Sequence, residues 1–333
     1  MKKNQELENI FKSKCDYGDF QFSYSSLNRL KFSPSLFYKD YILKDREVRT
    51  DKHLIEGKLI HLLLLQPEEF DNNFALVPGK IPSDAVRRVL NEVKDTDKNK
   101  SYLEHLEPII TTALKHQNLY QSIKDDSKRL SKILTDDNKE YYKFLLNCDG
   151  KDIIDQDIYK KCNDSVELIK ENKSVMEALA SDETDFELDE TESFVEKALS
   201  CKLQNYDFGL KGVIDKYIID HKNKEIRIID FKTTGKSVTE FADTVEFYNY
   251  WLQAAIYSIL VLKNAGKKSE NYKIKFTFIV IDKYNQIYNF AVRPTTLNEW
   301  YGGLEKTLEV AKYHIDNMNF DLPYEFLTNE VTL

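Results

Sequence analysis

Hydrophobic residues recur along this chain at two different spacings, and the spacing changes near residue 193. Before that point, apolar positions follow helical spacing in AVRRVLNEV, YLEHLEPIITTAL and SVELIKENKSVMEAL. After it, short runs of β-branched and aromatic residues bounded by polar turns predict strands. The predicted elements are helices within 24–65 and 83–180, strands at 194–203, 209–219 and 224–231, a helix over 247–266, strands near 273–281 and 286–293, and a helix at about 296–317. This order predicts an α/β fold that follows a mainly helical N-terminal part.

Charged residues interrupt one of the predicted strand pairs. The stretch GVIDKYIIDHKNKEIRIIDFKTTGK, residues 212–236, predicts two antiparallel strands joined at a polar HKNK turn. Side chains two apart on a strand share a face, so Asp230 and Lys232 are expected to project together, with the core behind them. Asp215 would approach Asp230 if the hairpin twists or splays there, and the sequence leaves that register open. The same stretch is also compatible with a surface hairpin that carries solvated charges.

Two carboxylates and one ammonium at the same point suit metal-assisted hydrolysis of a phosphodiester. Hard cations such as Mg²⁺ take oxygen ligands, and a bound cation lowers the pKa of a water and neutralises charge on the phosphate. As a compact point charge, Lys232 would position the attacking water or stabilise the developing oxyanion. The hairpin therefore indicates a candidate nuclease site.

Two predicted helices add polar residues at helical spacing. Gln253 and Tyr257 lie four apart on an otherwise apolar helix, hence on one face. They would contact the lysine, a metal-bound water or a phosphate. The alternative is a boundary pair at the edge of the core. In EGKLIHLLLLQPEEF, Gly57 and His61 are also four apart, and the glycine would leave space beside the histidine for a substrate or metal. A lone histidine on such a face is otherwise typical of a satisfied core or boundary position.

In combination, the order G-x-x-x-H, G-x-x-D, D-x-K-T-T and Q-x-x-x-Y resembles the PD-(D/E)XK nuclease superfamily in its RecB-like branch. Within that branch, three segments resemble the phage and prophage exonuclease VIII group, also called RecE-like. They are SYSSLNRLKFSPSLFYKDYI at 23–42, GKLIHLLLLQPEEFDNNFALVP at 57–78 and DFKTTGKSVTEF at 230–241. The similarity extends from about Phe22 to Tyr257. It implies a PD-(D/E)XK core, a mixed central sheet flanked by helices, with a large helical N-terminal elaboration.

Carried over residue by residue, the resemblance implies a catalytic set made of His61, Asp215, Asp230, Lys232, Gln253 and Tyr257. The metal ligands would be His61, Asp215 and Asp230, with the carbonyl of Phe231 as an additional one. Lys232 would be the catalytic lysine, and Gln253 with Tyr257 the helix motif of the family. Glu196, in FVEKALSC, would be a further acidic residue, and a solvated glutamate at a strand edge is the alternative.

The resemblance also implies an activity and partners. The expected function is a Mg²⁺- or Mn²⁺-dependent exodeoxyribonuclease that degrades one strand of linear double-stranded DNA from an end, 5′ to 3′, and leaves a 3′ single-stranded tail. Such tails are substrates for a single-strand annealing recombinase, so we expect a recombination partner of that kind and a ring-shaped homo-oligomer. One alternative is a structure-dependent DNA endonuclease with the same site. Another is a DNA-binding recombination scaffold whose site no longer turns over.

Composition agrees with a soluble enzyme, and the expected location is the cytoplasm. The resemblance implies a bacterial cell and a gene that could belong to a phage or prophage. A chain of 333 residues with 41% hydrophobic content can bury a substantial core. Its apolar runs are short. LIHLLLL is interrupted by a histidine and is far shorter than the ~20 residues that span a bilayer, and MKKNQELENIF lacks the apolar core of a secretion signal, so no membrane partner is expected. The four cysteines show no C-x-x-C spacing, which argues against zinc and against an iron–sulfur cluster.

A net charge of −8 opposes DNA binding unless positive residues gather locally. Basic residues are concentrated ahead of and around the predicted His61 helix, where they would form a phosphate track or solvated helix faces. The candidate DNA contacts are Arg29, Lys31, Arg46, Arg49, Lys58, Thr233 and Thr234. The expected organisation is a mainly helical part at 1–192 that contributes His61, a nuclease core at 193–320 and a tail at 321–333.

Overall fold

The computed structural model describes residues 2–47, 51–180, 191–328 and 331. The chain divides into two compact units: unit 1 comprises residues 1–50 and 168–333, and unit 2 comprises residues 51–167. These units do not follow the boundary predicted at residue 192. The difference arises because the N-terminal segment adds a strand and helices to the sheet of unit 1.

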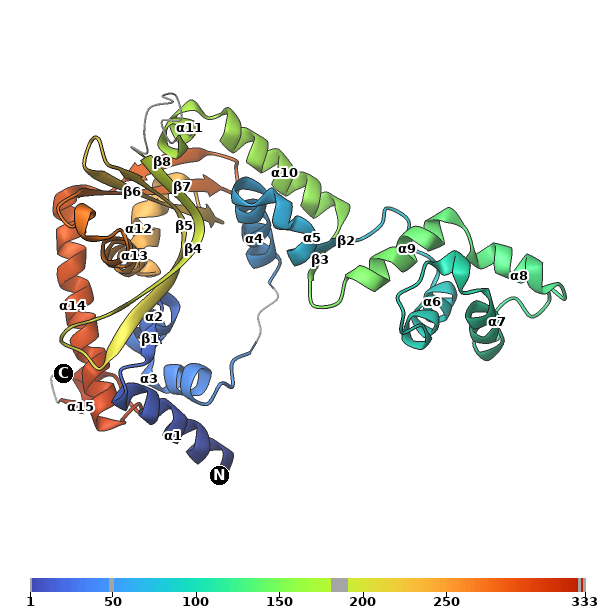
Figure 1. Cartoon of the computed structure of the whole chain (residues 1–333), viewed down its shortest axis with the longest axis horizontal. Helices are drawn as coiled ribbons and strands as arrows, with labels where there is room; N and C mark the ends of the chain where they lie inside the picture. Colours follow the sequence, from blue (N-terminus) through green and yellow to red (C-terminus); the bar gives the residue numbers. More distant parts are fainter. Residues whose placement is uncertain (1, 48–50, 181–190, 329–330, 332–333) are drawn as a thin grey trace. The chain divides into compact units, whose positions relative to one another are not determined.

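Unit 1 is built on a six-stranded mixed sheet (Figure 1). Its strands are β1 (Phe20–Phe22), β4 (Thr191–Lys202), β5 (Phe208–Asp220), β6 (Glu225–Thr234), β7 (Lys273–Asp282) and β8 (Ile287–Ala291). The order is β1-β5-β6-β7-β8, and β4 also pairs with β5. The pairs β4–β5, β5–β6 and β7–β8 are antiparallel, whereas β6–β7 and β1–β5 are parallel. The predicted α/β class, with a mixed central sheet flanked by helices, is confirmed.

The crossover from β6 to β7 is helical. It contains a 3₁₀ turn η4 (Val238–Glu240), α12 (Phe241–Phe247), α13 (Tyr250–Asn264) and a second 3₁₀ turn η5 (Lys267–Ser269). A single helix was predicted over 247–266, but Asn249 adopts a left-handed conformation, φ 55° and ψ 41°, and separates α12 from α13. The helix α13 stops just before Gly266, whose φ of 82° suits glycine.

The main core of unit 1 lies between the sheet and α13. One apolar cluster joins Ile214, Ile228 and Phe278 of the sheet to Leu252 and Ile256 of α13. The long helix α14 (Pro294–Asn317) contacts α13 and β7 beside this core (Figure 1). Asp230 is two residues from Ile228, so it shares the strand face that meets α13. The sequence predicted a core behind Asp230, on the opposite face of the strand. That prediction is incomplete, because α13 also covers the face that carries Asp230.

Short helices at the N-terminus complete unit 1. They are α1 (Lys2–Asp16), α2 (Tyr24–Phe32), α3 (Pro34–Phe37) and the π-helical turn η1 (Tyr38–Ile42). Ser23 forms a capping box with Ser26, and Ser33 caps α3 with Pro34 in its first turn. The helix α2 contacts both α13 and α14. Two further helices, α11 (Lys173–Leu179) and α15 (Tyr324–Leu327), lie in the C-terminal part of the unit.

Unit 2 is mainly helical, as predicted. Its elements are α4 (Lys52–Leu65), η2 (Pro67–Glu69), α5 (Phe70–Asn73), β2 (Phe74–Leu76), α6 (Asp84–Thr96), η3 (Leu103–His105), α7 (Glu107–His116), α8 (Asp126–Ile133), α9 (Asp136–Asn147), β3 (Asp152–Ile154) and most of α10 (Gln156–Glu171). One apolar cluster joins α6, α7 and α9, and a smaller one joins α4, β2, β3 and α10. The parallel pair β2–β3 was not predicted, because three-residue strands are too short to show a period. Among the described residues of both units, no helix combines the length and apolar character that crossing a bilayer requires.

Candidate active site

The strands β5 and β6 separate at the predicted site. Their last pair is Lys216 with Ile229, so the next residues, Asp215 and Asp230, stand where the ladder stops. There the Oδ2 atom of Asp215 accepts a hydrogen bond from the backbone N–H of Phe231 at 2.7 Å. Beyond this point β6 continues alongside β7. The two strands therefore splay where the sequence places its carboxylates.

A third carboxylate, Glu196 of β4, lies beside Asp215. The flanking β4–β5 pairs, Val195 with Lys216 and Lys197 with Ile214, place Glu196 directly opposite Asp215. Carboxylate oxygens of the two residues lie within 4.8 Å of one another. Glu196 is half-buried and has a φ of 45°, a left-handed conformation that is uncommon for glutamate. Such a local departure from strand geometry beside a carboxylate pair is typical of functional sites.

The two charged groups of the Asp-x-Lys motif meet, as their shared face predicts. The Nζ atom of Lys232 lies 2.5 Å from Oδ2 of Asp230, which is completely buried. The same ammonium lies 4.7 Å from the centre of the Tyr250 ring. Burial lowers the pKa of Lys232, but the charges of Asp230 and Asp215 outweigh burial and raise the pKa above its ordinary value. Lys232 is therefore a fixed cation at neutral pH.

Gln253 and Tyr257 of α13 face this site. The Nε2 atom of Gln253 donates to Oδ1 of Asp230 at 3.0 Å, so the lysine and the amide hold the two oxygens of one carboxylate. Burial raises the pKa of Tyr257, and the nearby charges of Asp230 and Asp215 raise it further. The phenol is therefore neutral at physiological pH.

Gly212 explains how α13 comes so close to β5. A Cβ atom at this position would lie 2.9 Å from Cε1 of Tyr257 and 3.2 Å from Cδ1 of Leu260. The glycine of the G-x-x-D motif thus makes room for the tyrosine of the Q-x-x-x-Y motif. These two motifs meet because a bare backbone on β5 faces α13.

The donors gathered in unit 1 suit a hard divalent cation. The carboxylates of Glu196 and Asp215 lie side by side, and carboxylate oxygens are preferred ligands of Mg²⁺ and Mn²⁺. Asp230 and the carbonyl of Phe231 follow directly on the adjoining strand. His61 lies half-buried on α4, which belongs to unit 2 and not to unit 1. Its role as a metal ligand stays a prediction.

The candidate DNA contacts are engaged in different ways. The Nε atom of Arg29 pairs with Asp40 at 2.9 Å, and Nζ of Lys58 pairs with Asp152 at 2.8 Å, so each is already held by a carboxylate. Lys31 and Arg46 lie over aromatic rings, Trp251 and Tyr41 respectively. Thr233 and Thr234 end β6 and pair with β7, while Arg49 lies outside the described residues. A phosphate-binding role for this set stays a prediction.

Two tyrosines next to the site were not among the predicted residues. Tyr250 lies under Lys232, and its ring centre is 6.4 Å from that of Tyr24 on α2. Burial raises the pKa of Tyr24, and the charges of Tyr250 and Asp230 add to the shift. Tyr24 is part of the quoted SYSSLNRL segment. It is far from Asp230 in the sequence, so no local pattern indicated that the two residues would lie near each other.

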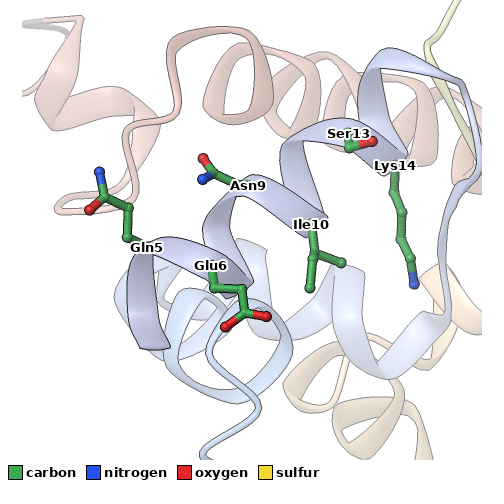
Figure 2. A pocket seen from close by; sticks show the side chains of 6 residues that line it. All are labelled: Gln5, Glu6, Asn9, Ile10, Ser13 and Lys14. Carbon is green, nitrogen blue, oxygen red and sulfur yellow. The ribbon is translucent and has the colours of Figure 1, made fainter. Parts of the chain in front are cut away.

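A separate hollow on the surface of unit 1 is lined by a single helix, α1, and contains none of the predicted site residues (Figure 2). Its lining side chains are Gln5, Glu6, Asn9, Ile10, Ser13 and Lys14. They include one acid and one base, and all six belong to α1.

A mixed sheet that holds a buried carboxylate–lysine pair next to further carboxylates suits metal-assisted hydrolysis of a phosphodiester. Comparison with known proteins agrees. The family model described as the PD-(D/E)XK nuclease superfamily matches residues 21–329, and the chain belongs to this family. Among curated proteins, no match was found. A solved structure of a candidate exonuclease from Eubacterium rectale is similar, with 13% identity, 96% of this chain and 91% of that chain covered, and a TM-score of 0.47.

Proposed function

We propose that this nuclease is a Mg²⁺- or Mn²⁺-dependent exodeoxyribonuclease that degrades one strand of linear double-stranded DNA, 5′ to 3′, and leaves a 3′ single-stranded tail. The observation that carries the proposal is the Asp230–Lys232 pair beside Asp215 and Glu196 on splayed strands. The family accounts for phosphodiester hydrolysis. The dependence on DNA ends and the polarity rest on the resemblance of residues 23–42 and 230–241 to the exonuclease VIII group.

Each residue has a distinct role in the proposed site. Glu196, Asp215 and Asp230 would hold the cation, with the carbonyl of Phe231 and His61 as proposed further ligands. A bound cation would lower the pKa of a water and neutralise charge on the scissile phosphate. Lys232 keeps a positive charge at the site, because Asp230 and Asp215 hold its pKa high, and it stabilises the phosphate oxyanion. Gln253 keeps the carboxylate of Asp230 in one orientation.

The experiment that tests this proposal is incubation with linear duplex DNA labelled at one 5′ end or one 3′ end. With Mg²⁺ we expect early release of the 5′ label as a mononucleotide, whereas the 3′-labelled strand shortens gradually from its other end. A chelator should abolish both. Early release of the 3′ label would contradict the polarity, and cleavage that persists in chelator would contradict the metal dependence.

Covalently closed plasmid DNA separates exonuclease from endonuclease action. An exonuclease leaves closed circles intact and degrades the same plasmid after linearisation. If closed circles are cut as readily as linear DNA, the assignment to an exonuclease is wrong. A parent protein that binds DNA ends but cleaves neither substrate would instead support a recombination scaffold.

The proposed partners and the His61 ligand have separate tests. A single-strand annealing recombinase would bind the 3′ tails, and a ring-shaped homo-oligomer would appear as a discrete multiple of the 39.1 kDa chain in analytical ultracentrifugation. For His61, Mn²⁺ binding measured by titration calorimetry should weaken in His61→Ala. Unchanged Mn²⁺ affinity in that variant would remove His61 from the ligand set.

A further inference from the structure

The turn between α12 and α13 displays aromatic side chains next to Lys232. Phe247 is 73% exposed and Tyr248 is 46% exposed. Tyr248 packs edge to face with Phe247 at 4.9 Å between ring centres and stacks on Tyr250 at 5.6 Å. Tyr250 in turn lies 4.7 Å from the Lys232 ammonium. These three residues, Phe247, Tyr248 and Tyr250, form an aromatic strip that leads from solvent to the proposed catalytic lysine.

Asn249 holds this turn in an uncommon backbone conformation. Its left-handed φ of 55° and ψ of 41° are rare for residues other than glycine, although asparagine tolerates them best. Its Nδ2 atom donates to Oδ1 of Asn28 at 2.8 Å, and its Oδ1 atom accepts from Nε1 of Trp251 at 3.1 Å. Because both ends of the amide are bonded, the turn has a defined shape.

The helix α2 fastens the same turn from the N-terminal segment. The hydroxyl of Tyr24 donates to the carbonyl of Tyr248 at 2.5 Å, and Nδ2 of Asn28 donates to the same carbonyl at 3.3 Å. Tyr24 and Asn28 belong to the SYSSLNRL segment, which the catalytic set does not use. Several polar contacts thus hold two large aromatic rings in water, although apolar surface is normally buried. This arrangement indicates a binding role for the rings.

Cations face the strip at both ends. The Nζ atom of Lys236 lies 5.7 Å from the centre of the Phe247 ring, and Lys232 faces Tyr250. The positive charge beside the strip comes from these two ammonium groups, because the neighbouring Glu246 is exposed and negative. Aromatic faces combined with lysine ammonium groups suit single-stranded nucleic acid, whose bases stack and whose phosphates are negative.

We infer that the aromatic strip binds unpaired nucleobases of the strand being cut, so that DNA reaches Lys232 as a single strand separated from the duplex end. Base faces inside a duplex are covered by their neighbours, so stacking on Phe247 and Tyr248 requires unpaired nucleotides. The identity of the strand and its end rests on the proposed function. The stacking itself is a binding property that can be measured without cleavage.

The test compares two fluorescein-labelled single-stranded oligonucleotides of equal length, one normal and one with abasic nucleotides throughout its central part. Full-length protein with Asp230→Asn removes cleavage while keeping the shape of the side chain. In this background, Phe247→Ala and Tyr248→Ala should each weaken binding of the normal oligonucleotide by about tenfold, as expected for the loss of one base–aromatic stack. Binding of the abasic oligonucleotide should change little, and Phe247→Trp should retain the preference for bases.

Tyr17→Ala is the matched control, since Tyr17 is 76% exposed in unit 1 but is not part of the strip. It should bind both oligonucleotides as the Asp230→Asn parent does. Equal affinity of that parent for normal and abasic strands would overturn the inference, and so would equal losses for both strands in the alanine variants. Cutting of closed circles would contradict the exonuclease assignment and leave the base preference intact, so the two failures are distinguishable.

Discussion

Asp97 and Asn138 of unit 2 and Asp230 of unit 1 are buried polar residues with different kinds of partner. In unit 2, the buried Asp97 accepts hydrogen bonds from the backbone N–H groups of Ser101 and Asn99, and the buried Asn138 donates to the carbonyl of Ile133. In unit 1, the buried Asp230 is held by Gln253, twenty-three residues away and on another element. Local partners satisfy the polar groups of turns and helix ends. Bringing charged side chains together from distant elements costs free energy of desolvation, and folding alone does not require that cost. Asp230 therefore differs from Asp97 and Asn138 in having a partner from a distant element.

The largest expected effect comes from breaking the Asp230–Lys232 pair. Asp230→Ala should abolish detectable cleavage and lower the free energy of unfolding of unit 1 by about 3–5 kcal/mol, because it leaves Lys232 buried without its partner. Adding Lys232→Met should recover much of the stability but none of the cleavage. Urea denaturation and the labelled-duplex assay measure the two quantities separately. If the double variant is no more stable than Asp230→Ala, the pair is not the source of the loss.

A methyl group at Gly212 should disturb the site through packing alone. Gly212→Ala places Cβ 2.9 Å from Cε1 of Tyr257, and overpacking of this kind costs about 1–3 kcal/mol. Cleavage should fall because Tyr257 and Gln253 share α13. Gly302→Ala in α14 meets no atom within 4 Å and serves as the control, with unchanged cleavage and slightly higher stability. Equal behaviour of the two variants, in thermal denaturation and in the nuclease assay, would contradict the close approach of α13.

The buried polar residue of unit 2 gives the complementary result. Asp97→Ala should lower the stability of unit 2 by about 1–3 kcal/mol, because the N–H groups of Asn99 and Ser101 lose their acceptor. Cleavage per folded molecule should stay the same. Hydrogen exchange of amides in α6 and α9 would report the stability change. A loss of cleavage at temperatures where the variant is fully folded would show that Asp97 is more than a structural residue.

The smallest expected effect is the pH dependence of stability that His314 contributes to unit 1. Burial lowers the pKa of His314, which is completely buried on α14, so the unfolded chain binds a proton more readily than the folded one. Its contribution to stability is therefore complete above about pH 6.5 and is lost as pH falls from there through the lower folded pKa, by at most about 1.4 kcal/mol per pH unit. Urea denaturation at pH 7.5 and pH 5.5 measures this loss. His314→Asn should reduce this loss.

Much of the fold could be predicted from local patterns. The strands of the 212–236 hairpin, the caps at Ser23 and Ser33 and the long helix α14 follow from alternation, capping chemistry and helical spacing. The shared face of Asp230 and Lys232 was also predictable, because a strand repeats every two residues. The break at Asn249 and the β2–β3 pair were not, since each depends on contacts with residues remote in sequence.

The amino-acid sequence by itself determined the residue types of the site and which of them share a face within one strand or one helix. Only the tertiary structure decided that Glu196 stands opposite Asp215, that Gln253 holds Asp230, and that Tyr24 and Asn28 fasten the turn before α13. The physical reason is that covalent geometry sets the period within an element, whereas register and helix placement depend on packing summed over a whole core. The aromatic strip beside Lys232 is the clearest case, because its residues acquire their arrangement from α2, more than two hundred positions earlier in the chain.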